Sequence, residues 1–453
     1  RHKGPFMPFE ESFSRRRVAI IGGGISGMGA ARMLSQDHSV TLIEAAPRLG
    51  GHARTITAGK RGDQPVDTGF IVFNYANYPL LTQMFEDLDV PVAKSDMSFG
   101  ASVRASVWGG RLEYGLADMR AVFAQWRNAG DPRYLKMLRD VMRFNARALD
   151  VAQDSSLTIG GLLEQLGTGD WFRDYYLLPL SAAIWSTPKQ KILDFPADAM
   201  IRFFENHALL SHTGQHQWYT VQGGSIEYVR RLEATMRRDG VDIRLGTPVQ
   251  AVRRGMAGPE VRLDGHGWEA FDEIILATHS DDTLSLLSDP SVEEQAALGA
   301  IRYQPNTVTL HSDDSVMPRH RRAWASWNYR EGQNAEGQGE GGDALDLTYW
   351  MNRLQPIPAD DPLFVTLNAT RQIDEARIFD EVTLRHPVYD TAALAAQKDM
   401  ARLNGRNNTW FCGAWMRNGF HEDGLASAAD VVERLRAAAR PIPVPVQVPL
   451  VAE

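Results

Sequence analysis

The sequence lacks the cysteines and the long apolar runs that would indicate an oxidising compartment or a position inside a lipid bilayer. Its 453 residues include one cysteine, Cys412, so no disulfide can form within the chain. No run of about 18 apolar residues occurs, and the first residues lack the apolar core of a signal peptide. We therefore expect a cytoplasmic protein with no membrane-spanning helix, which is compatible with a peripheral position at the inner face of the membrane.

Excess positive charge and metal-binding motifs are also missing. The net charge is −8 at pH 7, which argues against a nucleic-acid partner. The sequence contains no G-x-S-x-G motif, no P-loop and no His/Cys/Asp cluster with zinc-ligand spacing, so we expect no metal. With 43% hydrophobic and 23% charged residues, the composition is that of a globular protein, and the length predicts two domains.

A glycine motif near the N-terminus is the strongest local signal. Residues 18–21 are apolar and mostly β-branched, which predicts a buried strand, and an Ala-rich helical stretch follows at 28–35. Between them, Gly22, Gly24 and Gly27 have G-x-G-x-x-G spacing. This spacing suits a tight turn, close approach of a pyrophosphate to the backbone, and close packing of helix on strand. A glycine-rich turn without a ligand is the alternative.

A second strand, predicted at 40–43, strengthens the ligand-binding interpretation. It ends in Glu44, at the usual distance for an acid that accepts hydrogen bonds from an adenosine ribose. The helix N-terminus after the glycines would offer free N–H groups and a positive dipole end to phosphates. The strand–turn–helix–strand order therefore predicts a Rossmann-like dinucleotide-binding unit.

The residues that follow resemble a particular superfamily. Arg48, Gly50, Gly51 and Thr55 match the R-x-G-G-R and Thr pattern of the flavoprotein superfamily of amine oxidases, phytoene desaturases and protoporphyrinogen oxidases, and His52 stands where that superfamily usually has Arg. Near the C-terminus, Gly413 and the stretch 424–426 resemble the segment that opens a helix against the flavin ring, with Ala414 where an acid is common. The resemblance implies FAD. It assigns FAD binding to Gly22, Gly24, Ile25, Ser26, Gly27, Glu44, Ala45, Arg48, Gly50, Gly51, His52, Thr68, Gly69, Phe70, Val249, Ala277, Thr278, Gly413, Glu422, Asp423, Gly424, Leu425 and Ser427.

The resemblance also implies the fold class and the domain boundaries. We expect an α/β protein, with a Rossmann-like FAD-binding domain interleaved with a substrate domain of mixed β-sheet plus helices. The FAD-binding domain would comprise residues 15–75, 216–290 and 405–440, and the substrate domain residues 76–215 and 291–404. The Pro-rich residues 441–453 should form an extended or disordered tail.

Within the expected substrate domain, two helical regions and a set of strands stand out. Residues 117–150 carry basic residues around apolar faces, which suits either an anionic membrane surface or a helical cap over a cavity. Residues 157–213 are predicted to be mostly helical and are rich in aromatics, which indicates core packing or a long apolar pocket. Strands are predicted at 307–311, 323–329, 346–351 and 363–368, with a Gly- and Glu-rich loop at 331–343.

Segments across nearly the whole chain resemble a narrower group, the predicted flavin-binding proteins associated with cyclopropane-fatty-acid-synthase-like methyltransferases. They include 66–74, 95–100, 323–329, 349–355 and 413–428. This resemblance implies desaturation of a methyl-branched fatty acyl chain in furan fatty acid biosynthesis. It also implies a fatty-acyl or phospholipid substrate, peripheral membrane contact and a lipid methyltransferase as partner.

A catalytic base is not fixed by the sequence. His421 and Glu422 precede the helix expected to meet the flavin ring, and three polar residues lie on the predicted second sheet: Tyr349, Asn352 and His311. Each could equally be a satisfied structural group. Two other functions stay open: an amine oxidase, or a non-catalytic flavin-binding partner of a lipid methyltransferase. Amine oxidases of the superfamily often have a lysine near flavin N5, and beyond residue 191 this chain has only Lys398.

Overall fold

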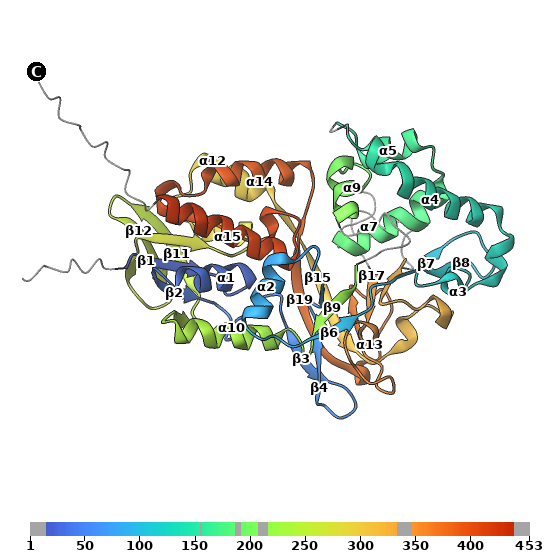
Figure 1. Cartoon of the computed structure of the whole chain (residues 1–453), viewed down its shortest axis with the longest axis horizontal. Coiled ribbons are helices and arrows are strands. Elements are labelled where there is room, and N and C mark those ends of the chain that lie inside the picture. Colours follow the sequence, from blue (N-terminus) through green and yellow to red (C-terminus); the bar gives the residue numbers. More distant parts are fainter. Residues whose placement is uncertain (1–14, 155, 186–191, 207–215, 333–345, 439–453) are drawn as a thin grey trace, which may run out of the picture.

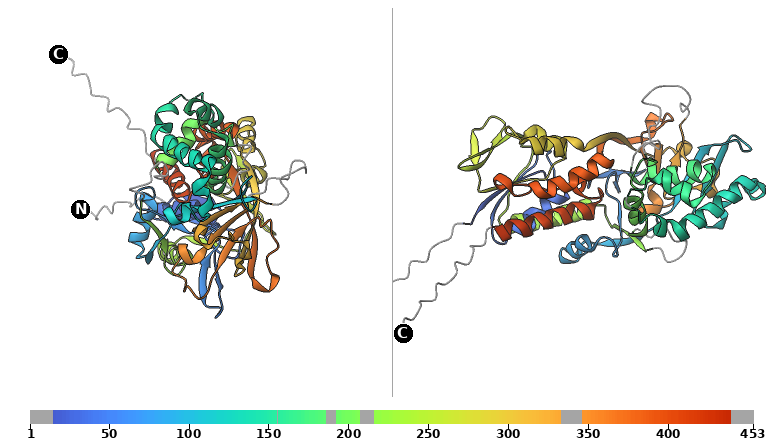
Figure 2. Two further views of the ribbon diagram at one scale, coloured as in Figure 1. Left: turned by 90° about the vertical axis from the view of Figure 1, so that its right-hand side faces the viewer. Right: turned by 90° about the horizontal axis from the view of Figure 1, so that it is seen from above.

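A computed structural model describes residues 15–438 apart from 155, 186–191, 207–215 and 333–345. The expected C-terminal tail, the Gly- and Glu-rich loop from residue 333 onward and parts of the aromatic helical region lie outside the described residues. The described chain forms two lobes side by side (Figure 1), and their separation is clearest from above (Figure 2). Within the described residues, no helix combines the length and the apolarity needed to cross a bilayer.

The first lobe is built on a five-stranded parallel sheet, as the glycine motif predicts. Its strand order is β10 (Asp242–Arg244), β2 (Ser39–Ile43), β1 (Arg17–Ile21), β14 (Glu273–Leu276) and β20 (Thr409–Phe411). Strand β1 lies in the centre, and its residues 18–21 are buried because both faces of a parallel sheet are covered.

Helices cover one face of this sheet and a smaller sheet covers the other. The helices are α1 (Ile25–Leu34), α2 (Pro79–Asp87), α10 (Ile226–Arg238) and α15 (His421–Ala438). The opposite face carries the antiparallel strands β11 (Val249–Gly255), β12 (Gly258–Leu263) and β13 (Trp268–Ala270), with α11 (Ser280–Leu286), α12 (Val292–Ala300) and α14 (Thr391–Leu403) beside them. We expected α2, α12 and α14 in the substrate domain, but their apolar faces pack on this lobe.

The second lobe is organised by a seven-stranded mixed sheet. Its order is β19 (Ile378–Val388), β15 (Arg302–His311), β18 (Phe364–Leu367), β17 (Asp346–Trp350), β16 (Trp327–Arg330), β7 (Phe99–Arg104) and β8 (Arg111–Gly115). Only the pairing of β16 with β7 is parallel. Alternation along the strands places apolar residues such as Val308 and Leu347 on one face and polar ones such as Thr309 and Asp346 on the other.

A group of helices covers the apolar face of this sheet. They are α3 (Met119–Val122), η1 (Trp126–Gly130), α4 (Pro132–Val151), α5 (Ile159–Leu166), α6 (Asp170–Phe172), η2 (Arg173–Leu177), α7 (Leu178–Trp185) and α9 (Ala197–Asn206). We call this group the cap. In Figure 1 it forms the end of the second lobe that lies away from α1 and α15.

Short elements join the lobes and surround the site. They are β3 (Thr55–Ala58), β4 (Gln64–Asp67), β5 (Val72–Phe73), β6 (Val92–Ser95), β9 (Trp218–Val221), α13 (Met351–Leu354), η3 (Asp314–Val316), η4 (Arg321–Ala323), η5 (Glu375–Arg377), η6 (Arg406–Asn408) and η7 (Ala414–Met416). Two expectations need correction. The strand expected at 323–329 begins only at Trp327, and the long edge strand β19 was not expected.

Candidate active site

The carboxyl ends of four parallel strands meet at one edge of the five-stranded sheet. Strands β1, β2, β14 and β20 end here, and they are followed by Gly22, Glu44, Ala277 and Gly413, respectively, the last after Cys412. Ligands of open α/β sheets bind outside this edge. The fold therefore brings four stretches of the predicted site to one place, although they are far apart in sequence.

The glycine turn packs closely against its neighbours at Gly22 and Gly27 and is open at Gly24. Gly22 has φ +108°, and a Cβ there would lie 2.6 Å from the carbonyl oxygen of Ala277. A Cβ on Gly27 would lie 1.8 Å from the carbonyl oxygen of Gly22, so α1 packs directly on the turn. At Gly24, by contrast, a Cβ would meet nothing within 4 Å. The open side of Gly24 is the surface a pyrophosphate would approach.

The N-terminus of α1 is free to bind an anion. Gly24 is its N-cap, no side chain accepts from the first N–H groups, and the first turn, which includes Ile25 and Ser26, contains no acid. Unpaired N–H groups and the helix dipole favour a phosphate at such an end. These features fit the diphosphate of FAD.

Glu44 is held at the edge of the sheet by the backbone around it. Its Oε2 accepts from the N–H of Gly23 at 2.6 Å, and its Oε1 accepts from the N–H of Ala46 at 2.7 Å. The exposed Ala45 lies between them. Residues 246–247, just before Val249, hydrogen-bond to the carbonyls of Ala46 and Glu44. This arrangement brings the start of β11, and with it Val249, close in the chain to residues that contact the Glu44 segment.

Arg48 holds a loop rather than pointing to open space. Its guanidinium donates to the carbonyl oxygens of Leu49, Gly51 and Ala53, at 3.0–3.1 Å. The same loop contacts the glycine turn, because the N–H of Gly50 donates to the carbonyl of Gly23. Through these hydrogen bonds, Arg48 stabilises the loop that packs against the glycine turn.

The next wall is formed by the loop after β4. A Cβ on Gly69 would lie 1.9 Å from the carbonyl oxygen of His52, to which the N–H of Phe70 also donates. The neighbouring Thr68 pairs with Arg54 through its N–H. His52 itself is enclosed, and its Nε2 has no hydrogen-bond partner within the described residues. An unpaired buried ring nitrogen facing this edge fits a polar group of a bound ligand.

Four partly buried histidines cluster at this edge, and two of them were not predicted. The ring of His52 lies 5.7 Å from that of His279 and 5.6 Å from that of His386, and His421 lies close enough to interact electrostatically with His52. Burial lowers the pKa of His279, His386 and His421 to about 3, and also lowers the pKa of His52. The cluster is therefore neutral near pH 7. We call these four residues the histidine cluster.

His421 occupies the first position of α15. Its Nε2 lies 2.7 Å from the hydroxyl oxygen of Tyr228, and its ring stacks on Phe70 with the centroids 3.9 Å apart. The neighbouring Glu422 accepts from the N–H groups of residues 80 and 81 and so caps α2. Asp423 accepts from the N–H of residue 420, and burial raises its pKa to about 6. Of the two catalytic candidates here, His421 faces the aromatic wall and Glu422 is committed to a helix cap.

The C-terminal motif packs on the first turn of α1, next to the glycine turn. A Cβ on Gly424 would lie 2.8 Å from Ile25 and 2.9 Å from Ser26, and Leu425 fills the space over Gly29. The N–H of Gly413 donates to the hydroxyl of Ser427 at 2.9 Å. Close contact between α1 and α15 thereby joins two motifs some 400 residues apart, and Thr278 completes the edge by accepting from Trp415.

Asp67 connects several elements around the site through hydrogen bonds to its carboxylate. The sequence analysis did not single it out. It is fully buried, and its carboxylate accepts from Thr55, from the N–H and hydroxyl of Ser225, and from Gln355. Burial raises the pKa of Asp67 to about 6. One carboxylate thus ties β3 and β4 to the turn before α10 and to the end of α13. The D-x-G pattern at 67–69 was the signal that could have revealed it.

The three candidates on the second sheet lie apart from one another. Tyr349 is buried on the apolar face, where its ring packs edge-on against Trp327 at 5.2 Å. His311 lies on the opposite, polar face, where it stacks on Phe364 and hydrogen-bonds to Thr366. Asn352 bonds to the carbonyls of residues 358 and 361 and to the N–H of residue 363, which closes a loop. Only Tyr349 faces the cap.

The structure brings the glycine turn, the N-terminus of α1, Glu44 and the C-terminal motif to one edge of the sheet. Comparisons with known proteins agree with this. A family model described as flavin containing amine oxidoreductase matches residues 25–353. Over 100 residues the chain is 41% identical to the FAD-dependent oxidoreductase dbaF of Emericella nidulans, which covers 22% of this chain and 21% of that protein. The chain thus matches about a fifth of the length of this curated relative.

Two solved structures share the fold. A CLA-producing fatty acid isomerase from P. acnes superposes with a TM-score of 0.65 and 15% identity, covering 92% of this chain and 98% of that one. A putrescine oxidase, solved in a redesign of its cofactor binding, superposes with a TM-score of 0.66 and 15% identity, covering 94% of this chain and 100% of that one.

Proposed function

Because the chain belongs to the flavin-containing amine oxidoreductase family and is an FAD-dependent oxidoreductase, we propose that it dehydrogenates a methyl-branched unsaturated fatty acyl chain carried in a phospholipid, as in furan fatty acid biosynthesis. When bound, FAD accepts a hydride from an activated C–H bond and returns the two electrons to an external acceptor. The α1 N-terminus, Gly24 and Glu44 would hold its diphosphate and ribose. The protein must then align an acyl chain and exclude water.

The observation that carries this proposal is a row of packed aromatic side chains that runs from the cofactor edge into the cap. Phe420 directly precedes His421 and stacks on Phe203 of α9, with the centroids 5.2 Å apart and the rings 16° from parallel. Phe203 contacts Phe204, which contacts Phe144 of α4. An acyl chain gains about 0.8 kcal/mol for each CH₂ buried against such side chains. A short polar amine would gain far less.

The apolar face of the second sheet supports the same substrate class. Trp327 and Tyr349 lie on it, and the Nε1 of Trp327 is buried with no hydrogen-bond partner within the described residues. That N–H is available to a carbonyl oxygen of a bound ester. The one lysine beyond residue 191, Lys398, lies on α14, which packs against the first sheet on the face opposite α1. These features favour a lipid over an amine.

His421 is our candidate for the proton acceptor. Burial lowers its pKa to about 3, so its ring is neutral near pH 7 and is a weak base that must pass any proton on. The contact with Tyr228 fixes the ring orientation, and the stacked Phe70 keeps water from its face. Tyr349 would contact the acyl chain from the opposite side. Of the alternatives for a base, Glu422 already accepts two backbone hydrogen bonds.

The proposed substrate places the protein at a membrane surface, on the cytoplasmic face, with a lipid methyltransferase supplying the methyl branch. The exposed Arg120 on α3 and Arg127 on η1 lie on the cap and could contact anionic head groups. Partner and location both rest on the proposed substrate class.

Anaerobic mixing of the FAD-loaded protein with phospholipid carrying a methyl-branched monounsaturated chain tests the function. We expect bleaching of the flavin's visible absorbance and a lipid product lighter by two hydrogens. Putrescine serves as the matched amine probe. Bleaching by putrescine alone would make the chain an amine oxidase, and bleaching by neither would leave a flavin-binding partner of the methyltransferase.

A further inference from the structure

An exposed apolar surface lies on the second lobe, at the end away from the cofactor edge. Trp108, on the turn between β7 and β8, is 79% exposed, and Trp126, the first residue of η1, is 74% exposed. Met119 of α3, in the segment that joins β8 to η1, is 67% exposed. Figure 1 shows α3, β7 and β8 at that end of the molecule. Large apolar side chains exposed together mark an interaction surface.

One arginine joins the two tryptophans. The guanidinium carbon of Arg127 lies 4.4 Å from the ring centroid of Trp108 and 5.4 Å from that of Trp126. Both rings and Arg127 are exposed, so the group presents apolar surface and positive charge side by side to the solvent. We call Trp108, Arg127 and Trp126 the tryptophan patch.

The backbone that carries the tryptophan patch is tied to the seven-stranded sheet. The side chain of Gln125, just before η1, accepts from the N–H of Glu113 at 3.0 Å and donates to the carbonyl oxygen of Arg111 at 2.9 Å, both on β8. Arg133 of α4 donates to the carbonyl oxygen of Ser106 at 3.0 Å, at the start of the turn. The patch is therefore held out toward solvent on an anchored backbone, so a partner would lose little conformational entropy in ordering it.

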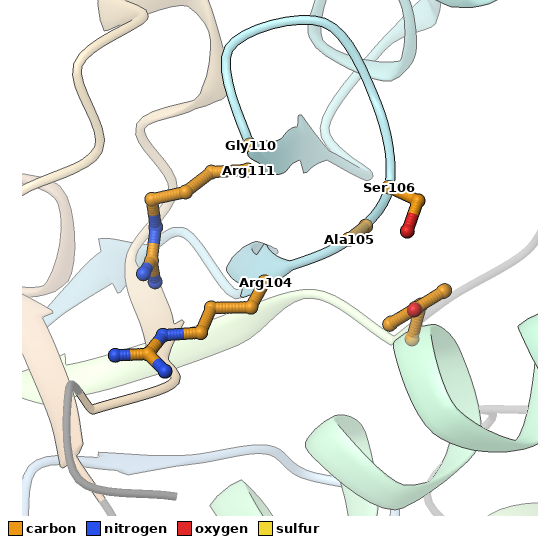
Figure 3. Close-up of a pocket in the computed structure, with 6 residues that line it drawn as sticks. Arg104, Ala105, Ser106, Gly110 and Arg111 are labelled. Carbon is orange, nitrogen blue, oxygen red and sulfur yellow. The ribbon is translucent and has the colours of Figure 1, made fainter. Parts of the chain in front are cut away.

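The turn between β7 and β8 projects from the sheet. Figure 3 shows it as a loop that arches away from the side chains of Arg104 and Arg111 at its two ends. Both of these arginines interact with other groups of the protein; Arg111, for example, donates to the hydroxyl of Ser102 and to the carbonyl oxygen of Glu331. The positive charge beside the exposed rings therefore comes from Arg127, which lies over them.

The charges around the tryptophan patch favour an anionic partner. Asp118 is the only acid among residues 116–130, and its carboxylate already accepts from the N–H of Ala121 as the N-cap of α3. Arg120, on the same helix, is exposed. The segment 104–147 has nine basic and four acidic residues, in a chain with a net charge of −8. An anionic surface would therefore attract this end of the molecule and repel the rest.

We propose that the tryptophan patch docks on an anionic lipid bilayer, with the two indole rings at the level of the head groups and Arg127 beside a lipid phosphate. Tryptophan is enriched at membrane–water interfaces because its ring is apolar and its N–H is polar. A basic residue near an anionic leaflet adds to such binding. The proposal names the docking surface for the membrane location in the proposed function, and it rests on that location.

Vesicle co-sedimentation of the FAD-loaded protein at low and high salt is the first test. Wild type should bind phosphatidylcholine vesicles that contain phosphatidylglycerol, and part of this binding should persist at high salt, because salt screens the arginine and leaves the apolar contact. A variant with Trp108→Ser and Trp126→Ser should bind about tenfold more weakly at high salt. Arg127→Gln should instead lose mainly the low-salt preference for phosphatidylglycerol.

The matched control removes an exposed apolar side chain from the other lobe. Met256 lies on the turn between β11 and β12 and is fully exposed, so Met256→Ser should bind vesicles as wild type does. Unchanged flavin absorbance and melting temperature would show that each variant is folded. If the serine variant of the tryptophan patch binds vesicles as wild type does, the bilayer proposal is wrong, and the patch becomes a surface for a protein partner.

Quenching by brominated phosphatidylcholine tests whether the two rings enter the bilayer. The chain has 11 tryptophans, so the measured quantity is the difference in fluorescence quenching between wild type and a variant with Trp108→Phe and Trp126→Phe. This variant keeps apolar rings and should still sediment with vesicles. Brominated lipid should quench wild type and lose most of that effect in the variant. Equal quenching of both proteins would overturn the proposal.

A dehydrogenation assay in detergent separates the docking surface from the proposed reaction. Phospholipid dispersed in detergent offers no bilayer, so the serine variant should turn it over at the wild-type rate. Failure of wild type in this assay would contradict the proposed reaction and leave the vesicle results standing. Full activity in detergent, with vesicle binding that does not depend on Trp108 and Trp126, would contradict the docking surface alone.

Discussion

Glycines at the cofactor edge differ from those of the β7–β8 turn and the cap in how closely the backbone packs around them. In the cofactor lobe, a Cβ on Gly27 or Gly69 would lie less than 2 Å from a carbonyl oxygen. In the other lobe, Gly109, Gly110 and Gly130 have nothing within 4 Å of that position. The cofactor edge thus depends on close backbone contacts at Gly27 and Gly69, whereas the three glycines of the β7–β8 turn and the cap make no such contact. Short sequence motifs predict the cofactor edge, and we expect its close-packed glycines to tolerate no side chain. Neither statement holds for the β7–β8 turn and the cap.

The largest expected effect comes from adding one methyl group to a glycine in each lobe and comparing the two variants. We expect Gly27→Ala to lose folding or FAD binding altogether, because its Cβ cannot move away from the carbonyl of Gly22 and overpacking typically costs about 1–3 kcal/mol even against softer neighbours. Urea unfolding and the flavin absorbance of the purified protein give the measurement. Gly130→Ala in the cap is the matched control and should stay within about 0.5 kcal/mol of wild type. Similar losses in both variants would show that the contrast is wrong.

Removing one polar group should separate cofactor binding from substrate contact. Glu44→Ala should weaken FAD binding by about 1.5–3 kcal/mol, because a charge-assisted hydrogen bond to the ribose is lost. Tyr349→Phe, on the apolar face of the other sheet, should leave FAD affinity unchanged and affect only turnover of the acyl substrate. Flavin fluorescence titration of the two apoproteins measures both. Equal FAD affinity for Glu44→Ala and wild type would mean that Glu44 does not hold the ribose.

The same contrast explains which features could be predicted from the sequence. The β1–α1–β2 unit is local, so apolar periodicity, glycine spacing and Glu44 were enough to place it, and the fold class was confirmed. Strand β19 escaped prediction because it is a sheet edge with charged residues and Pro387 in its span. The candidate His311 lies on the polar face of the seven-stranded sheet. Strand register decides the direction of every side chain, and the sequence does not reveal the register.

The histidine cluster was missed for a related reason. His279 follows β14, His386 lies on β19 and His421 begins α15, so only the tertiary fold brings them to His52. Arg48 illustrates a different limit. Its motif position was correctly aligned, but its guanidinium is used by three carbonyl oxygens of its own loop. A sequence motif identifies the residue at a given position, and the tertiary packing decides which groups its side chain contacts.

Acid should destabilise the cofactor lobe through this cluster. In the folded state the pKa of His279, His386 and His421 is about 3, below the usual 6.5, so folding stabilises the neutral form. That stability is complete above about pH 6.5 and is lost as pH falls toward 3, at about 1.4 kcal/mol per pH unit for each histidine. Urea unfolding at several pH values should show the slope, and His386→Gln should reduce it by about one proton.

The matched control for the acid slope is an exposed histidine. His266, at the turn between β12 and β13, is exposed, so His266→Gln is the matched substitution away from the histidine cluster. An unchanged slope in His386→Gln would mean that water reaches the histidine cluster in the folded protein.

The smallest expected effect concerns two arginines of the cap that differ only in their partners. Arg120 is exposed and makes no hydrogen bond or ion pair within the described residues, so its charge is available to a lipid surface. Arg143 donates to the carbonyl of Gly167 at 2.9 Å and lies 3.6 Å from Asp140. A basic residue near an anionic surface contributes about 1 kcal/mol to binding, so Arg120→Ala should bind phosphatidylglycerol vesicles about fivefold more weakly at low salt with unchanged stability.

Arg143→Ala should instead lose about 1 kcal/mol of folding stability, because the carbonyl of Gly167 loses its donor. Vesicle co-sedimentation and urea unfolding of both variants decide the matter. If Arg120→Ala binds vesicles as wild type does, α3 does not face the lipid, and a soluble substrate becomes the better hypothesis for the cap.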